Sequence, residues 1–148
     1  MSTIAATNLK NPSSASNNIV LDSSGNTRVG GSIADSAGSN TSTPAEIASG
    51  RAKAWVNFNG TGTVAIRASY NVSSITDNGT GTYTVNFTNA LADANYSIVY
   101  GAAHDGFSDG VVWSGFATYA TSGVQVFTGN ASTGALADLK VVNVAIFR

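Results

Sequence analysis

The chain has 148 residues and no cysteine, and its seven basic and eight acidic residues give a formal net charge of −1. Disulfides and thiolate metal sites are therefore excluded, and a near-neutral chain carries no electrostatic footprint for nucleic acid or for an anionic membrane surface. Only 10% of the residues are charged, whereas 66 of 148 are Ser, Thr, Asn or Gly. Such a composition favours a β protein on an extracellular or particle surface over a cytosolic enzyme.

The N-terminus carries no targeting pattern. It reads Met1-Ser-Thr-Ile-Ala-Ala, with no basic region ahead of an apolar run, so no secretory signal is predicted. No apolar run is long enough to span a bilayer, and no membrane insertion is expected. A surface of this kind without an export signal is expected in a particle that assembles in the cytoplasm.

Residues 1–50 are predicted to form an N-terminal segment for attachment and oligomerisation, ending in a linker. Large apolar residues are few here, so the segment cannot bury enough apolar area to fold alone. Its locally ordered piece runs from Ile19 to Val29 and is typical of a strand, a turn and a short strand, with Asp22 and Gly25-Asn26 supplying the turn. The residues expected to contact the particle or sister chains are Ile19, Val20, Leu21 and Val29.

A linker and a short helix are predicted after this hairpin. Gly38–Ser42 has the composition of a linker. Thr43-Pro-Ala-Glu46 is a capping-box pattern with proline in the first turn, and Gly50 is placed to end the helix. About seven residues are too few for a helix that stands alone, so it would serve as a single turn joining the two parts.

Residues 51–148 are predicted to form an all-β domain, an antiparallel β-sandwich or jelly-roll-like barrel, because short strands recur at regular spacing without a helical period. The predicted strands lie near Ala52–Phe58, Val64–Tyr70, Asn71–Thr76, Thr82–Thr88, Tyr96–Ala102, Val111–Tyr119, Val124–Thr128 and Lys140–Phe147.

The pentapeptide Asn-Gly-Thr-Gly-Thr occurs twice, at Asn59–Thr63 and Asn78–Thr82. Asn-Gly readily adopts the positive φ angles of a hairpin turn. Two such turns flanking Val64–Thr76 predict a β-meander, a single sheet that folds back on itself. The last strand is apolar at nearly every position, which predicts a central strand or one sealed against a second subunit.

One cluster holds residue types that could do chemistry: His104-Asp-Gly-Phe-Ser-Asp109. A hydrolase triad on a six-residue loop is an unusual arrangement, and no Gly-x-Ser-x-Gly elbow is present. No catalytic residue, metal site or cofactor is therefore predicted, and the loop is expected to be a polar connection. The alternative is a calcium-binding or receptor-contact loop. The receptor-contact candidates are His104, Asp105, Phe107, Asp109 and Trp113.

The two tryptophans follow strand spacing. Trp55 is expected in the core or in packing between subunits, and core packing is also the simpler reading of Trp113. Exposed aromatic rings stack on sugars in carbohydrate-binding β modules, so Trp113, Phe107 and Tyr119 are a lectin-type alternative.

Two stretches of the chain resemble virion structural proteins of tailed phages, above all the tail-fibre and surface-fibre proteins of marine phages. The first is Lys10-Asn-Pro-Ser-Ser-Ala-Ser-Asn-Asn-Ile-Val-Leu-Asp-Ser-Ser-Gly-Asn26, which looks like an N-terminal module of many such proteins. The second is Lys53-Ala-Trp-Val-Asn-Phe-Asn-Gly-Thr-Gly-Thr-Val-Ala-Ile-Arg67, continuing through Asp77-Asn-Gly-Thr-Gly81 to Val85-Asn-Phe87. It is similar to a recurring C-terminal domain, and the two stretches together span about a third of the chain.

The resemblance implies a non-enzymatic virion component, a homotrimer whose N-terminal segment attaches to another virion protein while the β domain faces outward. A tail-fibre or spike-like role is the first expectation. A capsid decoration protein and a module that binds a host surface glycan are the alternatives.

Overall fold

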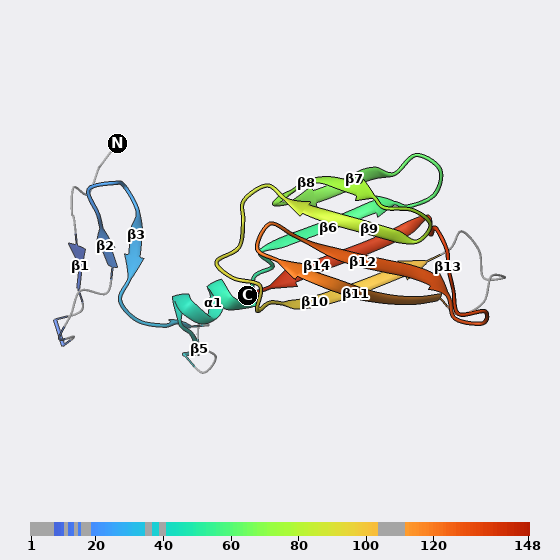
Figure 1. Cartoon of the computed structure of the whole chain (residues 1–148). Coiled ribbons are helices and arrows are strands. Elements are labelled where there is room, and N and C mark those ends of the chain that lie inside the picture. Colours follow the sequence, from blue (N-terminus) through green and yellow to red (C-terminus); the bar gives the residue numbers. More distant parts are fainter. Residues whose placement is uncertain are drawn as a thin grey trace. The chain divides into compact units, whose positions relative to one another are not determined.

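The computed structural model describes residues 8–10, 12–13, 15, 19–34, 37–38, 41–103 and 112–148 (Figure 1). For residue 8 and for residues 112–114, 116 and 117, only the strand positions are described. The chain divides into two compact units, Met1–Gly50 and Arg51–Arg148.

The N-terminal unit consists of short strands and one helix. Its elements are β1 (Asn8–Leu9), β2 (Ile19–Leu21), β3 (Thr27–Val29), β4 (Ile33–Ala34), β5 (Thr41–Ser42) and α1 (Pro44–Gly50). β1, β2 and β3 form an antiparallel sheet in that order, which confirms the predicted strand, turn and strand. The predicted linker is wrong at its end, because Thr41 and Ser42 pair with β4. Two-residue strands of this kind leave almost no sequence pattern.

The capping box at the start of α1 is confirmed. The N–H of Thr43 donates to Oε2 of Glu46 at 2.7 Å, and the N–H of Glu46 donates to Oγ1 of Thr43 at 3.2 Å. These bonds to Thr43 also hold the pKa of the Glu46 carboxyl below its ordinary value. The helix has seven residues and buries none of them.

The second unit is an antiparallel β-sandwich, as predicted. Its strands are β6 (Ala54–Asn59), β7 (Ala65–Tyr70), β8 (Val72–Asp77), β9 (Thr82–Phe87), β10 (Ser97–Ala103), β11 (Val112–Ala120), β12 (Gly123–Asn130), β13 (Ala135–Leu136) and β14 (Val141–Phe147). One sheet has the order β10-β14-β6-β7 and the other β11-β12-β9-β8, with β13 paired to β12. Figure 1 shows the two sheets as stacked layers.

Alternating side chains from both sheets form one core. In β6 and β14, every second residue is buried, and the same alternation occurs in β9. The fully buried residues with the largest side chains are Tyr83, Phe58, Leu139, Ile146, Val56, Val85, Val124, Val126, Val142 and Thr128. Phe58 and Tyr83 meet edge to face across the sheets, with ring centroids 5.2 Å apart.

Both copies of Asn-Gly-Thr-Gly-Thr close hairpins, as predicted, but the predicted β-meander is wrong. The first copy joins β6 to β7 and the second joins β8 to β9, and these two hairpins belong to different sheets. The chain passes between the sheets at Asn71, whose φ is +53°. Its amide donates to the carbonyls of Lys53 and Asn89 and accepts the N–H of Asn89, which fixes the corner.

The last strand is central, which was one of the two predicted possibilities. β14 lies between β10 and β6 and pairs with both along most of its length. Its inward residues Val142, Val144 and Ile146 are buried, while Asn143 on the other face is exposed. β13, which the sequence did not predict, has only two residues.

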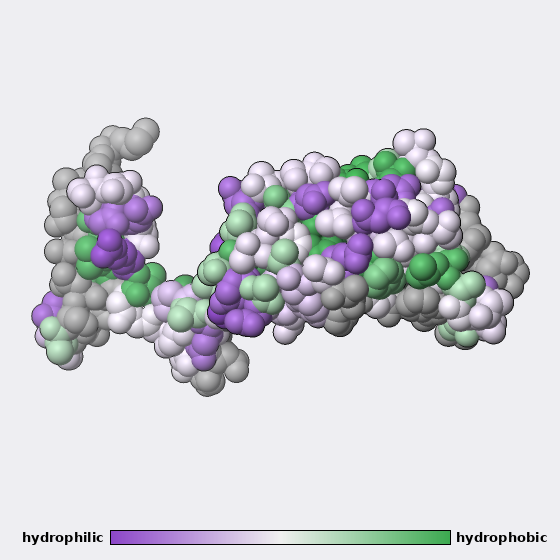
Figure 2. Space-filling model, viewed as in Figure 1, coloured by the Kyte–Doolittle hydropathy of each residue, from purple (hydrophilic) through white to green (hydrophobic). Residues whose placement is uncertain are grey.

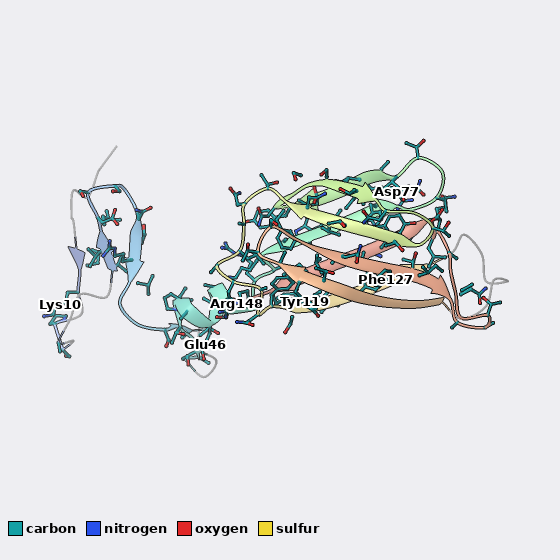
Figure 3. The ribbon with its side chains drawn as sticks, viewed as in Figure 1. Lys10, Glu46, Asp77, Tyr119, Phe127 and Arg148 are labelled. Atoms are coloured by element: carbon teal, nitrogen blue, oxygen red, sulfur yellow. The ribbon has the colours of Figure 1, made fainter. Side chains whose placement is uncertain are left out.

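The strand registers define two ends of the sandwich. At the entry end, the N–H of Lys53 donates to the carbonyl of Ile146, and Nε of Arg148 donates to Asp93 at 2.8 Å. At the loop end lie both copies of the repeat together with residues 137–139, because Gly60 and Gly81 bond to this segment. Figure 3 labels Arg148 at the entry end and Asp77 at the loop end.

Candidate binding surfaces

Three of the four predicted attachment residues share one face of the N-terminal sheet. Ile19 lies opposite Leu9 on one side and Val29 on the other, and directly opposed residues point to the same face. Leu21 follows two positions after Ile19 and lies on that face too. Val20 pairs with Arg28 and lies on the reverse face. We call Leu9, Ile19, Leu21 and Val29 the hairpin face.

The hairpin face is apolar and open to solvent. Leu9 is 54% exposed and Leu21 is 47% exposed. Ile19 and Val29 are half-buried, and no described residue of the N-terminal unit is fully buried. A sheet that buries so little apolar surface gains little free energy from its own packing.

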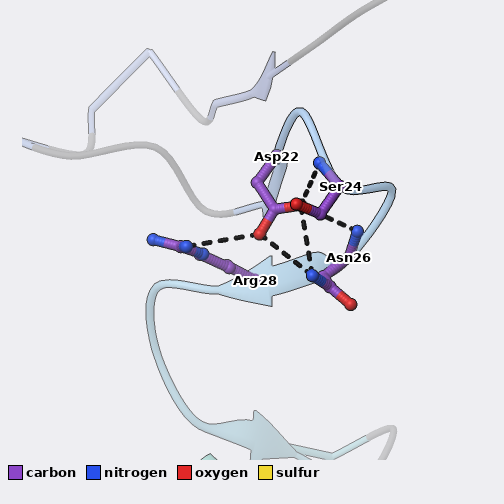
Figure 4. Close-up of polar contacts among 4 residues, drawn as sticks. All are labelled: Asp22, Ser24, Asn26 and Arg28. Atoms are coloured by element: carbon purple, nitrogen blue, oxygen red, sulfur yellow. Dashed lines mark hydrogen bonds and ion pairs between the residues drawn. The ribbon is translucent and has the colours of Figure 1, made fainter.

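The turn of this hairpin is organised by one carboxylate, Asp22 (Figure 4). Its Oδ1 accepts the N–H groups of Ser24 at 3.0 Å and Asn26 at 2.9 Å. Its Oδ2 pairs with the guanidinium of Arg28 at 3.2 Å. The backbone bond from Asn26, followed by the other contacts, lowers the pKa of the Asp22 carboxyl. Figure 4 shows Ser24, Asn26 and Arg28 arranged around this carboxylate.

A second polar centre joins the two repeat copies at the loop end. The Tyr83 hydroxyl lies 2.9 Å from the carbonyl oxygen of Gly60 in the first copy and 2.8 Å from Oδ1 of Asp138. The same Oδ1 accepts the N–H of Gly81 in the second copy at 2.7 Å. Burial, assisted by Asp138, raises the pKa of the Tyr83 phenol far above its ordinary value. The phenol therefore stays protonated, and the cluster acts as a structural brace.

The predicted receptor-contact residues lie mostly outside the described residues. His104, Asp105, Phe107 and Asp109 lie outside them, and Trp113 is described only as a position in β11, paired with Gly129. The described residues on either side of this segment are paired, Ala103 with Val141 and Val112 with Asn130. Both pairs are at the loop end, opposite to where the chain enters the sandwich.

No metal-binding group and no membrane-spanning helix is present in the described parts of the chain. Nowhere within them do three or more His, Cys, Asp or Glu side chains gather. The short helix α1 is also far from the length and apolarity needed to cross a bilayer.

Of the two places predicted for Trp55, the core is wrong, while packing between subunits stays a prediction. Trp55 is 39% exposed and points to the outer face of the sheet β10-β14-β6-β7. The sequence held a signal for this, because Trp55 alternates with Ala54 and Val56 and shares its parity with Asn57 and Asn59. The buried residues of β6 are Ala54, Val56 and Phe58, so the residues that alternate with them in the strand face outward.

The outer face around Trp55 is a shallow open hollow of about 410 Å³. Its lining residues are Trp55, Val56, Asn57, Val99, Tyr100, Gly101, Asn143, Val144 and Ala145, none of which is charged. Tyr70, directly opposite Trp55 on β7, is 51% exposed. We call the outward residues Trp55, Asn57, Tyr70, Val99, Gly101, Asn143 and Ala145 the Trp55 face.

The other sheet presents a different outer surface. Thr84, Asn86, Thr118 and Gln125 line a smaller hollow of about 180 Å³ there, without an aromatic side chain. Tyr119, a predicted sugar-stacking residue, is 38% exposed, and its ring packs against Tyr96 with centroids 5.2 Å apart. Figure 2 shows mostly pale and purple atoms over the face in view, with green atoms in separate patches.

Neither a family model, nor a curated protein, nor a solved structure matches the chain.

Proposed function

We propose that this protein is a non-enzymatic structural component of a tailed-phage virion, a homotrimer attached to another virion protein through its N-terminal unit. The observation that supports this most is that the unit forms a paired hairpin although none of its described residues is fully buried. Its hairpin face, with Leu9 and Leu21 about half exposed, offers apolar surface that sister chains or a neighbouring protein can cover.

The layout of the sandwich supports an outward orientation of the β domain. Arg51 and Arg148 lie at the entry end, while both repeat copies and the flanks of the 104–111 connection lie at the loop end. An attachment made before Arg51 therefore leaves the loop end as the free end of the sandwich. The resemblance to tail-fibre proteins gives the same orientation.

The oligomeric state tests this proposal. Sedimentation equilibrium of the purified chain should give three times the mass of the 14.9 kDa chain. Leu21→Asp places a charge on the hairpin face and should dissociate the trimer, whereas Ser32→Asp, at an exposed position of the same unit, should not. A stable monomer in the unaltered protein would contradict the proposed assembly.

The location on the particle needs a separate measurement. Quantitative mass spectrometry of purified virions gives the copy number of this chain relative to the major capsid protein. A few trimers per particle would support a fibre or spike, and a copy number that follows the capsomers would instead support the decoration alternative. Absence from purified particles would refute a virion role of either kind.

A further inference from the structure

We propose that the Trp55 face binds a neutral carbohydrate, with the indole ring of Trp55 stacking on a sugar ring and Asn143 hydrogen-bonding to its hydroxyls. This inference goes beyond the structural role and does not depend on where the chain lies in a particle. It also moves the sugar-binding site away from the residues that the sequence suggested, His104 to Trp113.

The first observation is a row of side chains across the four strands. Trp55 is opposite Ala145 on one side and Tyr70 on the other, and Ala145 is in turn opposite Val99. These four residues share the outer face, since directly opposed residues point the same way. Three strand spacings span about 14 Å, which gives room for more than one sugar ring along the row.

The second observation is that small residues lie on the β14 side of Trp55, whereas Tyr70 lies on the β7 side. Ala145 on β14 is directly opposite Trp55, and Gly101 on β10, the next strand, has no side chain. A Cβ placed on Gly101 would meet no atom within 4 Å, so the glycine opens space without any packing need of its own. The hollow beside Trp55 exists because these positions are small.

The third observation is a directed chain of hydrogen bonds that ends at the hollow. The guanidinium of Arg67 donates to Oδ1 of Asn57 at 3.4 Å, so the amide nitrogen of Asn57 is its donor end. That nitrogen donates to Oδ1 of Asn143 at 2.6 Å. The Nδ2 group of Asn143 then donates to no acceptor in the described part of the chain, although the residue is exposed.

Arg67 itself is fixed in place. Its two terminal nitrogens donate to the carbonyl of Phe58 at 2.8 Å and to the carbonyl of Lys140 at 2.6 Å. It lies at the irregularity between β6 and β7, where its neighbours Ile66 and Ala68 pair with Phe58 and Asn57. The donor direction of the amide pair is therefore set by the fold before any ligand arrives, which lowers the entropic cost of binding.

These features together match a neutral sugar. A pyranose has an apolar face that stacks on an aromatic ring and a rim of hydroxyls that pair with amide groups. The residues that line the hollow are uncharged, and the guanidinium of Arg67 beside Asn57 already donates to two backbone carbonyls, so the lining matches a neutral ligand. A second copy of the chain is the competing occupant. If this face were the core of such an interface, the side-chain NH2 group of Asn143 would lose its water without gaining an acceptor, which costs free energy.

The test is binding of defined oligosaccharides to the full chain. The probes are hexasaccharides of glucose, xylose, mannose and N-acetylglucosamine, with a hexamer of uronic acid as the charged comparison, measured by affinity electrophoresis and calorimetry. We expect at least one neutral probe to bind, and Trp55→Ala and Trp55→Leu to weaken that binding at least about tenfold. Trp55→Phe, which keeps a ring, should weaken it only a few-fold.

Two further variants assign the polar contact. Asn143→Ala should weaken binding several-fold, whereas Gln125→Ala, which removes an amide from the outer face of the other sheet, should leave it unchanged. Circular dichroism and the thermal midpoint of each variant establish that the sandwich is intact.

Several results would overturn the proposal. These are binding of no probe by the unaltered chain, binding of the uronic acid hexamer alone, and neutral binding that Trp55→Ala leaves intact. If Trp55→Ala or Trp55→Leu dissociates an oligomer that binds no sugar, the face is a subunit contact instead. If the chain is a trimer that binds none of the sugars, this inference is refuted and the proposed assembly is not. If the chain is a monomer that binds a sugar, only the proposed assembly is refuted.

Discussion

The hydroxyl of Tyr83 and the carboxylate of Asp138 lie 2.8 Å apart at the loop end of the sandwich, although 55 residues separate them in the chain. Asp138 also accepts the N–H of Gly81, and the hydroxyl lies within reach of the Gly60 carbonyl. One tyrosine and one aspartate thus fix both copies of the repeat to the segment that precedes β14. The brace positions the loop end independently of any ligand.

Tyr83→Phe should therefore destabilise the sandwich without changing its fold. The change removes one hydroxyl from a buried site and leaves the Gly60 carbonyl or the Asp138 carboxylate with one donor fewer, at an expected cost of about 1–3 kcal/mol. Urea denaturation followed by fluorescence measures the free energy of unfolding. Tyr70→Phe is the matched control, because Tyr70 is half exposed, and it should change that free energy by less than about 0.5 kcal/mol. Equal effects of the two variants would contradict the brace.

The sequence was sufficient for the strands, because their signal is local. β6 shows buried Ala54, Val56 and Phe58 at every second position, and the eight longer strands of the sandwich lie close to their predicted ranges. β13 was missed since Ala135-Leu136 is defined by its pairing with β12 and by no pattern of its own. The sequence signals of the hairpin turns and of the capping box of α1 were also local.

The sequence was not sufficient for relations between distant segments. Two hairpin turns do not say whether the hairpins share a sheet, and the crossing depends on Asn71 reaching Lys53 and Asn89. Asp138 gave no signal, because its partners Tyr83 and Gly81 are remote. The Trp55 face needed the register that brings Asn143 beside Asn57. Such contacts depend on tertiary packing, and the hydrophobic periodicity of one sequence does not show which distant segments come together.

The second glycines of the two repeats should respond differently to the same substitution. Gly62 and Gly81 both have φ +61°, so alanine costs about 1–2 kcal/mol of backbone strain at either one. A Cβ at Gly62 meets open space, whereas at Gly81 it would lie 2.3 Å from the carbonyl oxygen of Thr128. We expect Gly81→Ala to lower the free energy of unfolding by about 3 kcal/mol or more, with a clearly smaller loss for Gly62→Ala. Denaturant midpoints that coincide would show that the close approach at Gly81 is not real.

The corner between the sheets should depend on both the backbone and the side chain of Asn71. Asn71→Ala removes the hydrogen bonds to Lys53 and Asn89 and also puts a Cβ-bearing residue without a polar side chain at φ +53°. Asn71→Gly removes the same bonds but relieves the strain. Both should be less stable than the unaltered chain, and the glycine variant should be the more stable of the two by about 1 kcal/mol. Thermal denaturation gives the order, and a glycine variant no more stable than the alanine variant would refute the role of φ.

The N-terminal hairpin should loosen in acid. The pKa of Asp22 is lowered in the folded chain, chiefly by the N–H of Asn26, so its contribution to stability is complete above the ordinary pKa of an aspartate. It is lost as the pH falls through the lower, folded value, when protonation removes the acceptor of Ser24 and Asn26 and the partner of Arg28. The amide signals of Ser24 and Asn26, followed by NMR from about pH 6 down to about pH 2, should shift and lose exchange protection together. In Asp22→Asn this titration should be absent. Exchange protection should already be reduced at neutral pH, because the ion pair with Arg28 is gone. If the acid transition of these two amides persisted in that variant, another group would be responsible for the transition.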